Sequence, residues 1–547
     1  MKNSEAVKIA LQNTLAEGLT DIFPRPFEVD LLKNEKFYNK VRDELINTFN
    51  SIDSTVIKHE KDYGKLLDIL KVHPIQHVLY PKKEAFDYRR CALIDPLDTI
   101  KYTTLVVSIS REIEKARIAR GKNVIFSYRL QSMDKGIIFN PKYTYTNFEK
   151  HARAEIKKKT VKVLVRCDIA NFYDRLNLHR LESNLHSLPI EKKRVKLINE
   201  LLLLWANRDS YGLPVGGNAS RILAEAALIE VDNYLVSHEV KFSRFVDDYR
   251  LFAKDAKQAH YWISLLIERL SLEGLLINQS KTRISDVSGE KATSFITLKR
   301  LETEKEQEAV KKENTDTELK KATRIISGYS GTIPTKFKES TENEIKKIQE
   351  SDSQNIIKKI NSAIVISPDE FKEYCKAILY NKNWKEFEKL VDVLEKFPQF
   401  SPYAVDMLVK NEGIIPDTVC QKIRDSISSW LLGGDYISEY MAIAFVKLLS
   451  SDKFKDTEAL FSYFRSLKRN AGNYIGRAIL EGLEPYITRG EALEIRQYYN
   501  RADRWEKRQI IKIVDKKLMD AEKQAWFKNI RMNESNEVFT IGTIQNG

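Results

Sequence analysis

The sequence predicts an α+β domain followed by an all-α domain, with a mainly helical region ahead of both. Three observations support this. The 547 residues exceed one ordinary core, short β-branched runs alternate with amphipathic segments between about residues 80 and 300, and strand signals nearly vanish beyond about residue 335. We expect an N-terminal helical region over 1–80, the α+β domain over 81–302, a charged linker over 303–335 and a helical-repeat domain over 336–547.

The elements follow from local patterns. Apolar residues recur at helical spacing in the N-terminal region, except where Pro24 and Pro26 stop or kink a helix. The α+β domain combines strand-like runs, VKVLVRCDI (161–169) and KFSRFV (241–246), with amphipathic helical ones. Residues 303–323 are highly charged, as in an exposed helix or linker. Beyond them, Pro and Gly punctuate helical segments at a spacing that suits stacked hairpins of the HEAT type, although no internal period is present.

The composition is that of a folded protein with a polyanionic partner. A net charge of +13 favours nucleic acid, because clustered Lys and Arg displace counterions condensed on phosphates; the alternative is a surface charge that only keeps the protein in solution. No segment has the length of a membrane span, and the N-terminus lacks a signal-peptide core, which predicts a cytoplasmic protein without membrane contact. We expect reduced, mostly buried thiols from four widely spaced cysteines: Cys91, Cys167, Cys375 and Cys420.

The segment RFVDDYRLF (244–252) sets two adjacent acids, Asp247 and Asp248, between apolar runs. Such flanks predict the tight turn of a β-hairpin with buried strands. Adjacent carboxylates repel each other, so a site that keeps both ionised needs a cation. The alternative is an ordinary solvated turn, because about one or two Asp-Asp pairs are expected by chance in a chain of this length.

A third acid, Asp168, ends the strand-like run in VKVLVRCDIANFYDRL (161–176). A carboxylate at the end of a core strand is costly unless it is paired or binds a metal, and a metal shared with Asp247 removes that cost. In the two-metal scheme, ions about 4 Å apart activate the attacking hydroxyl, hold a triphosphate and neutralise the leaving pyrophosphate. We expect Asp168 and Asp247 to bridge two Mg²⁺ or Mn²⁺ ions, with Asp248 in support, which predicts nucleotidyl transfer.

Tyr173 lies five residues past Asp168, where many polymerases carry the group that inspects the sugar. An aromatic ring there fills the space of a ribose 2′-hydroxyl and so favours deoxynucleotides. The alternative is a core aromatic packed behind the strand, a role that Phe172 fits better. Asp174 suits a surface or capping position more than metal binding.

Two further segments complete the set. YGLPVGGNASRILAEAALIEVDNYL (211–235) is a glycine-rich turn before an amphipathic helix, in which Gly216 and Gly217 let the backbone approach a nucleotide or template closely. In GLLINQSKTRI (274–284), Asn278 and Lys281 follow a short apolar strand. Asn278 is a candidate substrate-binding residue, and Lys281 is a candidate to protonate the pyrophosphate or hold its charge. Taken alone, an ordinary structural turn and a surface lysine explain these segments equally well.

The ordered set of DIANFYD, GLPVGGNAS, FVDD and NQSKT resembles the sequence blocks of reverse transcriptases, in the order that the family uses, over about residues 80 to 300. The resemblance implies a fingers–palm (right-hand polymerase) fold, in which residues 303–335 are either the charged linker or a thumb-like segment. Upstream, PKKEAFDYRRCALIDPLDTIKY and NVIFSYRL are similar to fingers blocks. This similarity implies that Arg89, Arg90 or Arg129 contacts the incoming triphosphate.

Within the family, the chain resembles the phage-defence branch of abortive-infection (Abi) and related unclassified bacterial reverse transcriptases. The resemblance rests on Phe in place of the usual Tyr before the acidic pair, an IxNFYD block and a long helical C-terminus. It implies a cytoplasmic DNA polymerase that uses dNTPs, makes a DNA product, has RNA as a candidate partner and assembles into homotrimers or hexamers with a HEAT-like C-terminal domain.

Some members of that branch prime on a protein tyrosine and extend DNA without a template. Val215 departs from the Gln or Ala often found in the glycine-rich turn, so template use stays open. Two alternatives to the defence enzyme remain. One is an RNA-templated reverse transcriptase of the retron or group II intron type, and the other is a catalytically silent nucleic-acid-binding scaffold.

Overall fold

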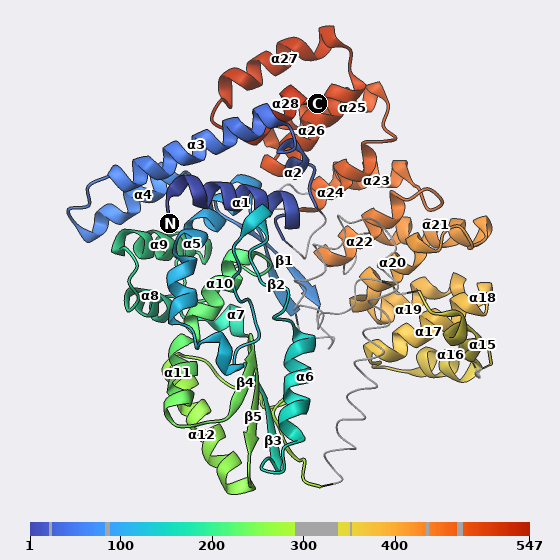
Figure 1. Ribbon diagram of the computed structural model, residues 1–547. Coiled ribbons are helices and arrows are strands. Elements are labelled where there is room, and N and C mark those ends of the chain that lie inside the picture. Colours follow the sequence, from blue (N-terminus) through green and yellow to red (C-terminus); the bar gives the residue numbers. More distant parts are fainter. Residues whose placement is uncertain are drawn as a thin grey trace. The chain divides into compact units, whose positions relative to one another are not determined.

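The computed structural model describes residues 1–20, 25–81, 88–289, 337, 339–350, 353–433, 437–467 and 474–546 (Figure 1). Its contacts divide the chain into two compact units. One unit contains residues 1–75 and the chain from 94 to 289, and the other contains residues 76–93 and the chain from 337 onward. The first unit joins residues 1–75 to the α+β domain, because the N-terminal helices pack on that domain, whereas a boundary was expected at residue 80. The predicted linker over 303–335 lies outside the described residues.

A four-stranded antiparallel sheet lies at the centre of the first unit, in the order β4-β5-β3-β6. Its strands are β3 (Val163–Asp168), β4 (Phe242–Phe245), β5 (Asp248–Ala253) and β6 (Arg283–Asp286). β-branched and aromatic residues fill β3 to β5, as buried strands require, and the strands predicted at 161–169 and 241–246 are present. The register of the two inner strands sets Asp168 opposite Asp248.

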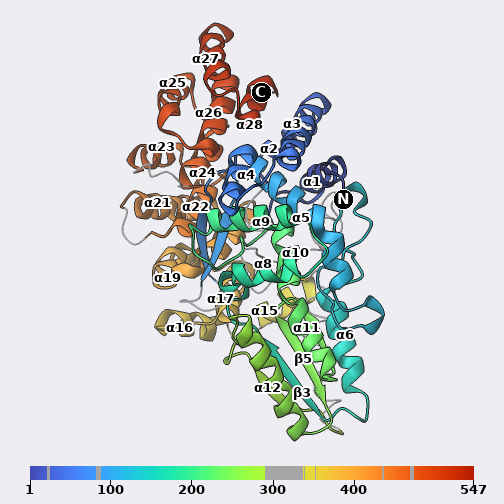
Figure 2. The ribbon, with the colours of Figure 1, turned by 90° about the vertical axis from the view of Figure 1, so that its left-hand side faces the viewer.

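Helices cover this sheet and build the rest of the first unit. α6 and α12 lie on opposite sides of the strands (Figures 1 and 2), and on the α6 side Leu164 and Phe252 pack against Ala152 and Ile156. The helices that follow the sheet strands or flank them are α6 (Tyr145–Ile156), α7 (Phe172–Arg175), α8 (Leu178–His186), α9 (Lys192–Trp205), α10 (Asn218–Ala227), α11 (Ile229–Ser237) and α12 (Ala256–Leu272).

The long helix α5 (Pro96–Ala116) connects the N-terminal helices to this α+β layer. It begins where the Asp95 carboxylate accepts the Leu97 N–H at 3.1 Å and Pro96 occupies the first turn. Most of α5 is buried, because α1, α9 and α10 all pack on it. The predicted N-terminal helical region is α1 (Asn3–Glu17), α2 (Glu28–Leu31), α3 (Glu35–Ser54) and α4 (Tyr63–Leu70).

The second unit joins a β-hairpin to helices. The antiparallel strands β1 (Gln76–Pro81) and β2 (Tyr88–Leu93) form the hairpin, and the Tyr88 ring lies 6.1 Å from that of Tyr440 on α22. The helices are α15 (Glu342–Glu350), α16 (Ser353–Ser362), α17 (Pro368–Tyr380), α18 (Trp384–Glu388), α19 (Leu390–Lys396), α20 (Ser401–Lys410), α21 (Asp417–Gly433), α22 (Glu439–Leu449), α23 (Thr457–Ser466), α24 (Tyr474–Leu483), α25 (Arg489–Gln497), α26 (Arg504–Lys517), α27 (Asp520–Asn533) and α28 (Val538–Asn546).

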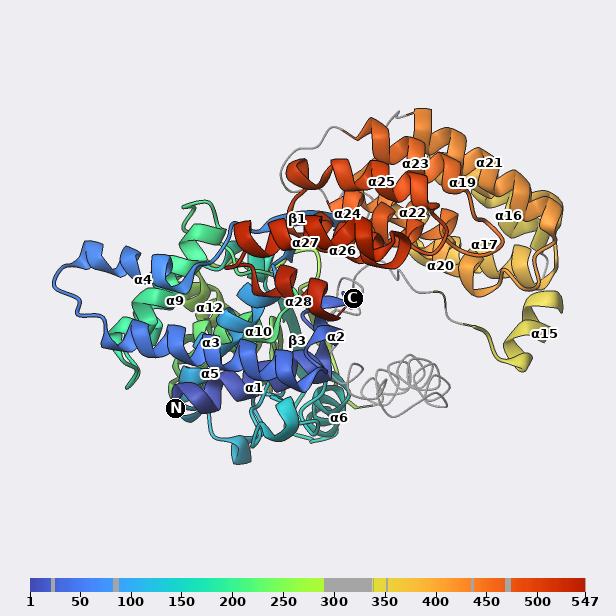
Figure 3. The same cartoon turned by 90° about the horizontal axis from the view of Figure 1, so that it is seen from above.

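These helices stack in two rows around one apolar core. α20, α22, α24 and α26 each contact the next member of their row, and α19, α21 and α23 do the same in the other (Figure 3). The C-terminal region is therefore largely helical, as predicted. The assignment of the stack to the HEAT type stays a prediction.

All four cysteines are buried and carry free thiols, as their wide spacing predicted. Within the parts of the chain that the structure describes, no helix combines the length and the apolar character that crossing a bilayer requires.

Candidate active site

The acidic pair lies at the tip of the β4–β5 hairpin. Phe245 pairs with Asp248, and Val246 and Asp247 form the two-residue turn between them. Val246 has φ of 55°, in the left-handed region that a β-branched residue rarely adopts. Two-residue hairpin turns favour Asn and Gly for this reason, so the Val246 backbone is strained. The predicted tight turn between buried strands is present.

Asp168 reaches the same place from β3. It is the last residue of that strand, and its register partner on β5 is Asp248. The next residue, Ile169, donates its N–H to the Asp247 carbonyl at 3.2 Å, which ties the end of β3 to the hairpin turn. The three acids therefore meet at one end of the sheet, although Asp168 is far from the other two in the sequence.

The cluster is electrostatically unfavourable while it holds no cation. Burial, and then the charges of Asp168 and Asp248, raise the pKa of Asp247 from 3.8 to about 7. Burial also raises the pKa of Asp248, although the nearby Arg250 guanidinium acts in the opposite direction. A buried group of like charges needs a counter-charge to stay ionised, and a bound divalent cation supplies one.

The segment 274–284 lies against Asp168. The Asn278 side-chain amide donates to Asp168 Oδ2 at 3.2 Å, and the Asn278 N–H donates to the Asp168 carbonyl at 2.6 Å. Lys281 Nζ lies 3.1 Å from the same Oδ2, although 64% of the Lys281 side chain is exposed. The structure thus brings both predicted residues of this segment to the acids, with Asn278 holding a carboxylate.

Sequence reasoning missed a group behind Asp248. Arg250 Nη1 donates to Asp248 Oδ1 at 3.1 Å, and Arg250 Nη2 donates to Glu149 Oε1 at 3.0 Å. The Tyr145 hydroxyl lies 3.5 Å from Arg250, and its ring packs edge-on against Phe245. Strand alternation puts Asp248 and Arg250 on one face, a signal that was available in the sequence. Nothing local indicates Glu149 or Tyr145, since both come from α6.

The donors suit a hard divalent cation in kind, because three carboxylates gather there. They do not form a complete coordination sphere: among the described residues, no group of three or more His, Cys, Asp or Glu side chains is arranged to hold a metal ion. Asp168 is paired with Lys281, and Asp248 is paired with Arg250.

Tyr173 lies on α7, close behind Asp168 in the chain, and only 7% of it is exposed. Its carbonyl accepts the Leu213 N–H at 2.8 Å, which fastens the glycine-rich segment to α7. Its ring meets the Phe172 ring at a centroid distance of 5.5 Å. Both aromatics are buried, so Phe172 fits the core role expected of it, and the role of Tyr173 at the sugar stays a prediction.

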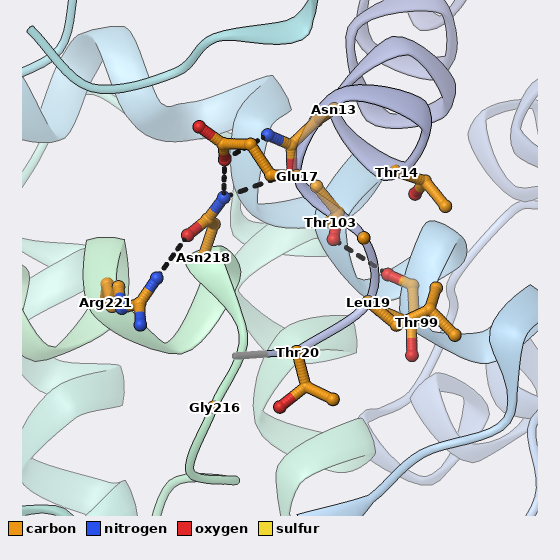
Figure 4. A pocket seen from close by; sticks show the side chains of 11 residues that line it. Asn13, Thr14, Glu17, Leu19, Thr20, Thr99, Thr103, Gly216, Asn218 and Arg221 are labelled. Atoms are coloured by element: carbon orange, nitrogen blue, oxygen red, sulfur yellow. Dashed lines mark hydrogen bonds between the residues drawn. The ribbon is translucent and has the colours of Figure 1, made fainter. Parts of the chain in front are cut away.

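The glycine-rich turn contacts the N-terminal helix. Gly216 has φ of 120°, which requires glycine, and Gly217 caps α10. Asn218 donates to Asn13 at 3.2 Å and also to Glu17, while Arg221 donates to Asn218 at 2.7 Å (Figure 4). Residues of α1, α5 and α10 line a polar pocket here. In the structure, side chains of α1 lie against this turn, and the approach of a nucleotide to it stays a prediction.

The three predicted fingers arginines differ in position. Arg129 is 1% exposed, and its guanidinium donates to the Ile118 carbonyl at 2.5 Å and lies 3.4 Å from Glu114. The Arg129 guanidinium is therefore buried among internal partners, and its contact with a triphosphate stays a prediction. Arg89 and Arg90 lie on β2 in the second unit, where Arg90 contacts His77 at 3.2 Å, and their contact with a triphosphate stays a prediction.

One comparison, with protein families, bears on this site. Residues 100–312 match the family model described as Reverse transcriptase (RNA-dependent DNA polymerase). The telomerase of Candida albicans, solved in complex with a TWJ fragment of telomeric RNA, is 11% identical with a TM-score of 0.29, over 83% of this chain and 68% of that one. The apo telomerase of Candida tropicalis is also 11% identical with a TM-score of 0.29, over 80% and 69%.

Likenesses to solved structures at this level do not identify a function, and no curated protein matches the chain. The family match is the informative result, because it covers the acidic hairpin, Asp168 and the glycine-rich turn. Residues 100–312 match a reverse transcriptase domain, and this domain indicates an RNA-directed DNA polymerase.

Proposed function

We propose that this chain synthesises DNA from dNTPs by two-metal nucleotidyl transfer at Asp168, Asp247 and Asp248. One observation carries the proposal: the register of β3 and β5 sets Asp168 opposite Asp248, with Asp247 in the adjoining turn. A catalytically silent scaffold fits less well, because clustered carboxylates repel phosphates and gain nothing from a binding role alone.

Each residue of the cluster has a distinct task in this proposal. Bound Mg²⁺ or Mn²⁺ supplies activation of the attacking hydroxyl and neutralisation of the leaving pyrophosphate. Asp168 and Asp247 hold the cations with help from Asp248, and Asn278 fixes the Asp168 carboxylate through its amide. Lys281 is exposed enough to turn from Asp168 to the triphosphate and donate a proton to the pyrophosphate.

Selection of the sugar falls to Tyr173. Its position close behind Asp168, on a helix fastened to the glycine-rich segment, suits a ring that excludes a 2′-hydroxyl. Gly216 and Gly217 would then let the template or nucleotide approach the backbone beside it. Arg89 and Arg90 remain candidates for the triphosphate.

The proposal extends to anti-phage defence of the abortive-infection kind. It is supported by the resemblance of the FVDD and IANFYD blocks to that branch, and by the long helical region that follows the domain. The same resemblance supports a homotrimer or hexamer, a HEAT-like second unit and protein-primed, untemplated synthesis. The competing assignment is an RNA-templated enzyme of the retron or group II intron type.

Incorporation of labelled dNTPs by the purified chain, in Mg²⁺ or Mn²⁺ and with or without added primer–template, tests the activity. We expect incorporation by the wild type and by Asp43→Asn, which changes an exposed acid on α3, and none by the Asp247→Ala, Asp248→Ala variant. Equal incorporation by the double variant would refute the proposal.

Sequencing of the nucleic acid that copurifies separates the two assignments. DNA attached covalently to the protein, made without added template, supports the defence type. A structured partner RNA whose sequence appears in the product supports the retron or intron type. Loss of phage resistance in cells that carry the double variant tests the defence role itself.

A further inference from the structure

Arg244 is a fully buried arginine three residues before Asp247 on β4. Its guanidinium forms a fork with Asp232 of α11, through Nε at 2.9 Å and Nη2 at 2.6 Å. Nη2 also donates to Glu225 of α10 at 2.9 Å. Both carboxylates are buried as well, so this is an internal ion cluster and no part of it faces solvent.

Arg117 brings a second cation to the cluster and also pairs with Glu114. Arg117 donates to Glu225 Oε2 at 2.6 Å, the same oxygen that accepts from Arg244 Nη2. The Tyr249 hydroxyl donates to Asp232 at 3.3 Å and completes the group. Burying such ions costs about as much as their attraction returns, and apolar residues of similar volume often serve stability as well or better. Stability alone therefore does not explain why Arg244 is there.

One contact of Arg244 leaves the cluster and reaches the acidic turn. Its Nη1 donates to the Val246 carbonyl at 2.9 Å. Val246 is the residue with the strained left-handed backbone, directly before Asp247. The backbone of Arg244 is itself held by the segment 124–126, since its N–H donates to the Val124 carbonyl at 2.8 Å and its carbonyl accepts from Phe126 at 2.9 Å. These hydrogen bonds fix the backbone from which the Arg244 guanidinium extends.

We propose that Arg244 is a positioning residue: anchored by Asp232 and Glu225, it holds the Val246 carbonyl and keeps the turn in the conformation that directs Asp247 toward Asp168 and Asp248. A lysine carries the same charge but lacks the planar fork, so it cannot serve both carboxylates and the turn together. The inference rests on the proposed function, since it assumes that Asp247 binds a cation.

A charge-neutral variant tests this role without leaving an unpaired buried ion. Arg244→Met combined with Asp232→Asn removes one charge of each sign and keeps the Arg117–Glu225 pair. Tyr249→Phe is the matched control, because it touches the cluster at Asp232 but not the turn. Val246→Asn is the rescue, because Asn tolerates the left-handed backbone that Val resists.

The main measurement is the Mn²⁺ affinity of the protein alone, without nucleotide or nucleic acid, next to its thermal unfolding. We expect the double variant to unfold within a few degrees of the wild type and to bind Mn²⁺ about tenfold or more weakly. Adding Val246→Asn is expected to recover most of that loss, and Tyr249→Phe to bind as the wild type does. The rate of dNTP incorporation is expected to follow the same order.

Three outcomes would overturn the inference. The first is a folded double variant with wild-type Mn²⁺ affinity, and the second is a loss that Val246→Asn leaves unchanged. If the double variant does not fold, Arg244→Lys replaces it: weaker Mn²⁺ binding by this folded variant supports the inference, and wild-type binding is the third overturning outcome. Equal Mn²⁺ affinity in the wild type and in Asp247→Ala instead overturns the proposed function, whatever Arg244 does.

Discussion

Replacing Asp247 with Asn is expected to stabilise the metal-free protein while abolishing its activity. Burial, with Asp168 and Asp248 close by, raises the pKa of Asp247 from 3.8 to about 7, so the folded state opposes its ionisation. The difference between these two values corresponds to about 4 kcal/mol at 25 °C. Because water reaches part of the Asp247 side chain, screening lowers the cost, and we expect a gain of about 2 kcal/mol.

The gain has a defined pH dependence. The pKa of Asp247 is higher in the folded state than the 3.8 of the unfolded chain. Below 3.8 the carboxyl group is protonated in both states and contributes nothing, whereas above about 7 the folded state holds an unfavourable charge. The wild type therefore loses stability as the pH rises through this window, and the Asn variant does not.

Urea unfolding of both proteins in EDTA, at pH 8 and at pH 3.5, measures this difference. Asp43→Asn on α3 controls for the loss of an exposed acid. Added Mn²⁺ should then stabilise the wild type more than Asp247→Asn, because a ligand stabilises the state that binds it. The reasoning fails if Asp247→Asn is no more stable than the wild type at pH 8, or if the gain is as large at pH 3.5.

Three further predictions concern two residues near the acids, Asn278 and Tyr173, and the packing of Gly136 on α1. Asn278→Ala removes the amide that donates to Asp168 at 3.2 Å, and an Mn²⁺ titration should show about tenfold weaker binding; unchanged affinity would contradict the role given to Asn278. Tyr173→Ala should raise ribonucleotide incorporation relative to deoxynucleotide by about tenfold or more, whereas Tyr173→Phe keeps the wild-type ratio, and equal ratios in all three proteins would exclude a sugar gate. Gly136→Ala places a Cβ against the backbone of Gln12 on α1, at φ of 78°, and should cost about 3 kcal/mol or more. Gly121→Ala meets no atom within 4 Å and should cost under about 1 kcal/mol; similar thermal midpoints would contradict the close packing of α1.

Local sequence patterns were sufficient for the elements that carry the acids. Alternation up to Asp168 predicted a strand that ends in a carboxylate, and apolar flanks around Asp247 and Asp248 predicted a hairpin turn; both are present. The glycine-rich turn was also readable, since Gly216 has a backbone that only glycine adopts easily. These features depend on residues within a few positions of each other, which is the range over which a sequence pattern carries information.

The tertiary structure alone decided which of these elements meet. Asn278 contacts Asp168 across 110 positions of the chain, and Arg250 contacts Glu149 across 101. The sheet order that makes β3 the neighbour of β6 creates the first pair, and the packing of α6 on β4 and β5 creates the second. Nothing in a local run specifies either arrangement. The burial of Arg129 likewise depends on tertiary packing.

The sequence by itself therefore determined the presence of three acids at element ends, the glycine-rich turn and the helical character of both flanking regions. Only the fold determined that the β-hairpin at 76–93 belongs with the C-terminal helices, that α1 lies on the glycine-rich turn, and that Arg244 connects two helices to the acidic hairpin. The physical reason is that strand and helix periods arise from neighbouring residues, whereas side-chain partners are set by contacts that close only when the whole chain packs.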